Sequence, residues 1–170
     1  MALDNLDNLK ASIIQWSKRN DQANMIEDYI LIAESEMYAN EFEPLRVRTM
    51  EARATAEAAS RFLALPDFFL EMRRLNITTS EGNSDITYMA PEQLEVRGRT
   101  GLPRFFTTTT QLEFDVTPDS NYTVEMQYLR KLTPLSSTNA TNDILDNSPT
   151  IYLFGALWAL FQNSLESDLA

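Results

Sequence analysis

The longest apolar segment of the chain lies near its C-terminus, where almost every position of residues 151–161 is hydrophobic. Ser148 and Pro149 precede it, a favourable start for a helix because serine can cap an orphan amide and proline has none to satisfy. The apolar run is too short to span a bilayer, which takes ~20 apolar residues. A helix that is hydrophobic all round is buried in a core or against other chains. We therefore expect a C-terminal helix that begins at Ser148-Pro149.

Two amphipathic patterns near the N-terminus predict a pair of helices. Hydrophobic residues recur at helical spacing in each pattern. The first set is Leu6, Leu9, Ile13 and Trp16, and the second is Ile26, Ile30, Ala33 and Met37. Asn20-Asp21 interrupts the periodicity and Pro44 follows it, so a helical hairpin is expected over residues 1–49.

The pattern changes over residues 50–134 to short segments rich in β-branched and aromatic residues, separated by turn-forming clusters. The predicted strands are residues 75–79, 86–89, 105–114 and 122–129. In the last of these, Val124, Met126 and Tyr128 alternate with polar residues, which is typical of a half-buried strand. Residues 54–64 stay ambiguous, because their alanines favour helix while the neighbouring segments favour sheet.

These elements predict an α+β fold, in which an N-terminal helical hairpin and a C-terminal apolar helix flank a central antiparallel β-sheet or sandwich. Residues 50–134 form the expected β domain. Residues 135–170 are a Ser-, Thr- and Asn-rich connector and the terminal helix, which we expect to pack with the hairpin.

Composition narrows the classes of function. The 170 residues include neither cysteine nor histidine and carry a net charge of -11. Disulfide scaffolds, thiolate zinc sites and Ser-His-Asp triads are thereby excluded. The acidic balance argues against tight binding to phosphate backbones. We expect no catalytic residue, no cofactor and no metal ion, and the first residues predict no signal peptide.

Five segments, in this order, resemble the head-to-tail adaptor family of tailed bacteriophages. They are residues 45–51 (LRVRTME), 65–73 (LPDFFLEMR), 90–94 (APEQL, a short helix in the family), 122–135 (YTVEMQYLRKLTPL) and 149–157 (PTIYLFGAL). Together they extend over most of the chain from residue 45 to the terminal helix.

The resemblance implies a non-enzymatic structural protein of the virion, made in the host cytoplasm and located at the head-tail junction. Such adaptors form a homo-oligomeric ring, expected to have twelve subunits, beneath the portal protein. The ring extends the DNA channel and joins it to a downstream tail protein, either a nozzle, a stopper or the tail tube. Genomic DNA would pass without sequence-specific binding, and no membrane is involved.

Two sets of candidate residues follow from this role. Contacts with neighbouring subunits or partner proteins are expected at Arg46, Arg48, Arg97, Arg99, Arg104, Tyr152 and Gly155. Glu27, Glu34 and Glu41 are spaced seven apart on the second helix and could face the channel, although a solvated helix face is the simpler interpretation. The arginines could equally form local pairs or an ordinary exposed loop. Most of the terminal helix could also pack inside the monomer.

Two other classes of function stay open. A stand-alone β-sandwich module of a tail would bind a glycan through aromatic residues such as Phe105 or Tyr128. A cell-wall hydrolase would use an acidic pair, either Asp67 with Glu71 or Asp115 with Asp119, although such pairs arise by chance among 25 acidic residues.

Overall fold

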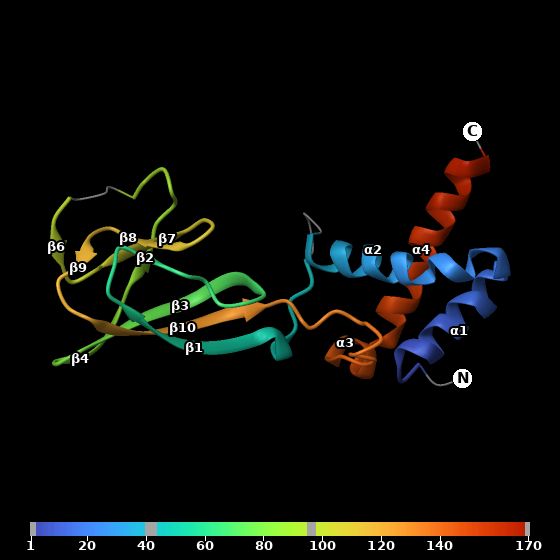
Figure 1. The fold of residues 1–170 in the computed structure, drawn as a ribbon, viewed down its shortest axis with the longest axis horizontal. Helices are drawn as coiled ribbons and strands as arrows, with labels where there is room; N and C mark the ends of the chain where they lie inside the picture. Colours follow the sequence, from blue (N-terminus) through green and yellow to red (C-terminus); the bar gives the residue numbers. More distant parts are fainter. Residues whose placement is uncertain (1–2, 40–43, 95–97, 169–170) are drawn as a thin grey trace. The chain divides into compact units, whose positions relative to one another are not determined.

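The computed structural model describes residues 3–39, 44–94 and 98–168, and it divides the chain into two compact units. The helical unit combines residues 1–46 with residues 132–170, and the β unit is the intervening segment, residues 47–131. Both ends of the chain therefore build one unit, and the β unit is an insertion between them (Figure 1). The fold is α+β, as predicted.

The helical unit is built around its last helix. Its elements are α1 (Leu6–Ser17), a 3-10 helix (Asn20–Met25), α2 (Ile26–Ala39), the short α3 (Asp143–Asn147) and α4 (Pro149–Asp168). α4 packs against α1, α2 and α3, and α1 also contacts α2 (Figure 1). The predicted helix start at Ser148-Pro149 is confirmed, since α4 begins at Pro149.

The β unit contains two four-stranded sheets. The first has the order β1-β10-β3-β4 and is antiparallel throughout; its strands are β1 (Glu51–Ala58), β10 (Tyr122–Arg130), β3 (Phe69–Thr79) and β4 (Gly82–Asp85). The second has the order β2-β8-β7-β5; its strands are β2 (Phe62–Leu63), β8 (Leu112–Phe114), β7 (Phe105–Thr108) and β5 (Thr87–Tyr88). The pair β5 and β7 is parallel, as is the small ladder of β6 (Thr100–Gly101) with β9 (Thr117–Pro118).

One hydrophobic core joins the two sheets. Leu75, Val124 and Met126 from the first sheet cluster with Phe106 and Phe114 from the second. The alternation predicted along β10 is confirmed, because Val124 and Met126 are buried while Thr123 is exposed. The core is therefore sandwiched between the sheets, as in small β-sandwiches.

Local details of the β unit differ from the sequence expectations. The alanine-rich start of residues 54–64 is strand, because residues 51–58 pair in register with β10. Residues 105–114 form two strands, β7 and β8, joined by a turn in which the Thr109 amide donates to the Gln111 carbonyl. The short helix implied for residues 90–94 is a turn, closed by hydrogen bonds from the Gln93 and Leu94 amides to the Ala90 carbonyl.

Candidate assembly surface

α4 has a buried face that fixes its position in the helical unit. Tyr152, Ala156 and Leu160 are fully buried, and Leu153 and Leu157 are almost so. These positions follow the helical period and face α1, α2 and α3, the elements that α4 contacts. One side of this helix therefore belongs to the core of the monomer.

Gly155 marks the closest approach of α4 to α2. A Cβ atom built on Gly155 would lie 3.0 Å from the Cβ of Ala33 and 3.8 Å from its Cα. Any larger side chain at position 155 would push the two helices apart, since Ala33 offers no flexible chain end that could move aside. Gly155, predicted as a partner contact, is thus used inside the helical unit.

A polar network fastens α4 to α2 and to the connector. Glu34 Oε1 accepts hydrogen bonds from the Tyr152 hydroxyl at 2.8 Å and from the Leu135 amide at 2.9 Å. Asn142 Nδ2 donates to the Tyr152 hydroxyl oxygen at 2.7 Å, and Asn142 also caps α3 through the Leu145 amide. The network satisfies polar groups that burial would otherwise leave without water.

Burial shifts the titration of this network. Desolvation raises the pKa of Glu34 above its ordinary value of 4.5, although the hydrogen bonds from Leu135 and Tyr152 act in the opposite direction. Desolvation also raises the pKa of Tyr152, and the nearby Glu34 carboxylate adds to that rise. The pKa of Tyr38, whose hydroxyl accepts from the Leu132 amide at 3.2 Å, is raised by burial as well.

The predicted acidic row on α2 is not a single exposed face. Glu34 is 7% exposed, because the packing of α4 and of the connector covers its carboxylate. Glu27 is exposed and forms an ion pair with Lys10 of α1. Glu41 lies outside the described residues. Glu34 therefore acts as a structural carboxylate in this unit. It is not the channel-facing residue that the sequence predicts, because its side chain is buried.

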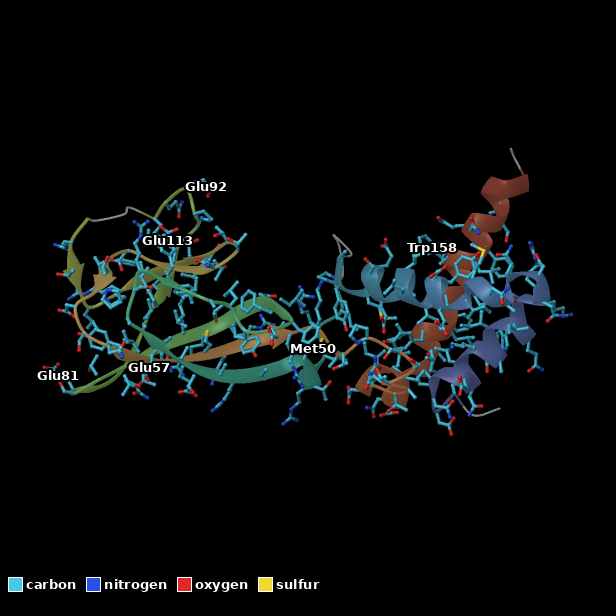
Figure 2. The ribbon with its side chains drawn as sticks, in the orientation of Figure 1. Met50, Glu57, Glu81, Glu92, Glu113 and Trp158 are labelled. Atoms are coloured by element: carbon cyan, nitrogen blue, oxygen red, sulfur yellow. The ribbon has the colours of Figure 1, made fainter. Side chains whose placement is uncertain are left out.

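The opposite side of α4 is apolar and open to solvent. We call it the α4 stripe and define it by positions spaced three and four apart: Ile151, Phe154, Trp158, Phe161 and Leu165. Phe154 is 56% exposed, Trp158 51% and Leu165 65%. Trp16 of α1, itself 59% exposed, extends this surface, since its ring meets Phe154 edge to face with centroids 6.0 Å apart. Figure 2 shows Trp158 on α4 beside α2.

A shallow groove runs beside the stripe where α4 meets α2. This α2–α4 groove has a volume of about 270 Å³ and is lined by Ala33, Glu36, Met37, Leu45, Ile151, Gly155 and Trp158. Small residues form part of its wall because Gly155 and Ala33 meet at the helix contact. Ile151 and Trp158 belong to both the stripe and the groove, so the two features are continuous.

The remaining predicted contact residues occupy separate places. Tyr152, like Gly155, lies inside the helical unit, where it contacts its own chain. Arg46 is exposed in the helical unit and donates to the Leu45 carbonyl, whereas Arg48 is exposed in the β unit. Arg99 and Arg104 are exposed in the β unit, and Arg97 lies outside the described residues.

Three residues named for the alternative functions, Asp115, Tyr128 and Phe105, make contacts within the β unit. Asp115 is 7% exposed and its Oδ1 accepts from the amides of Arg104 and Phe105, at 3.1 and 3.2 Å, so it connects the end of β8 to the start of β7. Tyr128 is 7% exposed and stacks on Phe69, and Phe105 is half-buried. Neither aromatic side chain is the exposed platform that the glycan-binding alternative requires.

The described part of the chain contains neither a cluster of metal ligands nor a helix suited to cross a membrane. No group of three or more metal-ligating side chains gathers there. None of the helices in those residues combines the length and the apolar character that a membrane crossing needs.

The sequence pattern shows that the residues of the stripe share one face of a helix, but it does not show that this face is exposed to solvent. Large apolar residues at positions 154, 158, 161 and 165 follow a helical period, and this alone favours burial in the monomer. Whether a face is covered depends on where the other helices pack, which the period does not reveal. The same holds for Trp16, whose spacing predicts a helix but not whether its side chain is covered.

The sequence matches a model of a known protein family. The family model described as SU10 adaptor protein matches residues 4–169, which is nearly the whole chain. No curated protein matches the sequence.

Proposed function

Because the chain belongs to the SU10 adaptor protein family, a family of phage head-to-tail adaptors, we propose that it assembles as a ring beneath the portal. Membership of this family gives the general role of the chain, which is a structural component of the virion that connects head and tail. The proposal adds the ring, with twelve subunits expected, and the continuation of the DNA channel through it. The portal protein lies on one side in this arrangement and a tail protein on the other.

The observation that carries the proposal is the exposure of the α4 stripe. Two tryptophans, Trp16 and Trp158, and two phenylalanines, Phe154 and Phe161, are each about half exposed on one surface of the helical unit. Large contiguous apolar patches on a folded protein mark interaction surfaces, because leaving them in water costs free energy that a partner would recover. This supports a protein that completes its fold by assembly.

Charge supports the conduit part of the proposal. The net charge of -11 disfavours adhesion to the phosphate backbone of passing DNA. Glu27 is the described member of the predicted acidic row that remains exposed, and we propose it as a channel-facing residue. Exposed arginines are our candidates for contacts with acidic groups of partner proteins: Arg46, Arg48, Arg99 and Arg104.

The experiment is direct reconstitution. The purified chain is mixed with the portal ring of the same phage, and the particles are examined by negative-stain microscopy with class averaging. We expect a second symmetric tier on one side of the portal. Bare portal rings, with the chain still monomeric in sedimentation, would overturn the proposal.

A further inference from the structure

The α4 stripe and the α2–α4 groove adjoin on one subunit and share Ile151 and Trp158, whereas Phe161 and Leu165 belong to the stripe alone. We infer that Phe161 and Leu165 of one copy insert into the α2–α4 groove of the next copy, an inference that rests on the ring proposed above. Each subunit then supplies both a knob, formed by Phe161 and Leu165, and the groove that receives the knob of another copy.

The residues of the stripe fall into two groups, according to whether they have a role within their own chain. Ile151 and Trp158 line the groove, and Phe154 packs against Trp16. Phe161 and Leu165 do neither, and they are 48% and 65% exposed. They are therefore the part of the stripe that projects toward another molecule.

The amount of apolar surface suits a stable contact between proteins. An aromatic side chain presents roughly 150–250 Å², so the half-exposed aromatic rings of the stripe with Trp16, together with Leu165, offer about 500 Å². Stable interfaces bury about 800 Å² on each partner. The stripe and Trp16 together therefore offer more than half of that area.

Charge points to a contact between apolar surfaces of identical copies. Residues 149–165 contain no Asp, Glu, Lys or Arg, so the knob and the α4 side of the groove are uncharged. Copies that each carry a net charge of -11 repel one another. Contact through the knob and the α4 side of the groove keeps the electrostatic cost low, because neither of these surfaces brings a charge that has to be desolvated.

The knob and the groove are formed by different residues, so the contact can be heterologous: the knob of each copy enters the groove of the next. A series of such contacts forms a ring when the rotation between neighbours closes it. Two copies that exchanged knobs reciprocally, or that paired stripe against stripe, would instead stop at a dimer. The ring proposed above therefore requires the heterologous form of the contact.

The groove has the shape to receive an apolar side chain. Gly155 and Ala33 contribute no bulk to its wall, whereas Met37 and Trp158 are large enough to enclose an inserted ring. Glu36 is exposed at the groove and faces solvent, which makes it a site for a reporter that leaves the core unchanged.

The absence of native cysteine allows a clean crosslinking test. The double variant Glu36→Cys with Leu165→Cys places one thiol at the groove and one on the knob, both at exposed positions. It is assembled with the portal ring, treated with a short bismaleimide and run on a denaturing gel. We expect a ladder of adaptor dimers, trimers and higher multimers, while each single variant stays monomeric.

The controls separate the possible failures. Asp7→Cys with Leu165→Cys moves the first thiol to an exposed position of α1 and should give no ladder. Dimers from Leu165→Cys alone would overturn the inference in favour of a twofold contact. A second tier in the micrographs, without crosslinked multimers on the gel, would overturn the inference but would still support the proposed ring. Portal rings without a second tier would overturn both the proposed adaptor ring and the inference about its contacts.

A pair of neighbouring substitutions gives an independent measurement. Phe161→Asp should lower the occupancy of the second tier at least about tenfold, because the knob would carry a charge into an apolar groove. Gln162→Asp introduces the same charge at the next exposed position, outside the stripe, and should leave the occupancy within about twofold. Equal occupancy for both variants would contradict the insertion of Phe161.

Discussion

The Tyr152 hydroxyl donates a hydrogen bond of 2.8 Å to Glu34 Oε1, although 118 positions separate the two residues in the sequence. This bond connects α4 to α2 across a buried interface. Because Glu34 also accepts from the Leu135 amide, one carboxylate joins two helices and the connector that leads into α3. Together with the buried apolar face of α4, these hydrogen bonds hold the helix, and hence its exposed stripe, against α2.

Removing the Tyr152 hydroxyl should weaken the helical unit. In Tyr152→Phe, Glu34 Oε1 loses one of its two donors and Asn142 Nδ2 loses an acceptor, so we expect the free energy of unfolding to fall by about 1–3 kcal/mol. Urea unfolding followed by circular dichroism measures the change. Tyr88→Phe, at an exposed position of the β unit, serves as the control. An unchanged midpoint in Tyr152→Phe would show that the network contributes nothing to stability.

The raised pKa of Glu34 predicts a pH dependence of stability. An acid whose pKa is higher in the folded state holds its proton more tightly there, so its contribution is fully present below its unfolded value of 4.5 and is lost as pH rises through the folded pKa. Glu34→Gln lacks this loss. We therefore expect its unfolding midpoint to improve relative to wild type as pH rises above 4.5. A constant difference between the two proteins from pH 4 to pH 7 would contradict the prediction.

The contact of Gly155 with Ala33 predicts a compensating pair of substitutions. Gly155→Ala improves helix propensity by about 1 kcal/mol but adds a Cβ atom 3.0 Å from that of Ala33. We expect a net loss of about 1–3 kcal/mol from the forced separation of the helices. Adding Ala33→Gly removes the contact and should restore part of the loss. A double-mutant cycle by urea unfolding measures the coupling, which would be near zero if the helices could simply shift.

Asp115 gives a prediction for the β unit. Asp115→Ala leaves the amides of Arg104 and Phe105 without their side-chain acceptor at a buried position, so stability should fall by about 2–3 kcal/mol. Asp115→Asn keeps an acceptor oxygen and should cost less. Chemical denaturation of both variants, with tyrosine fluorescence as the probe, distinguishes them; equal losses would mean that the charge of Asp115 matters and not its hydrogen bonds.

The sequence predicted those features that depend on neighbours along the chain. The α+β class, the start of α4 at Pro149 and the alternation of buried residues along β10 all follow from local periodicity and turn chemistry. The alanine-rich start of residues 54–64 could not be assigned, because its strand character comes from pairing with β10, about 70 residues away.

The candidate site was harder to predict for the same reason. Glu34 looks like a surface residue in sequence, and its burial is decided by the position of α4, which arrives at the end of the chain. Phe161 and Leu165 look like core residues, and they are exposed because the other described helices pack on the opposite side of α4. Polarity alone does not reveal which side of a helix the rest of the chain covers.

The insertion of the β unit has a consequence for synthesis. α1 and α2 leave the ribosome first, but α4 follows α2 by about 110 residues, a delay of roughly 5–20 s at 5–20 residues per second. During this time Ala33, Ile30 and Tyr29 lack the helix that covers them. A chain that stops before α4 therefore has neither the groove nor the stripe. Under the proposed role, the order of synthesis would keep such fragments out of the ring.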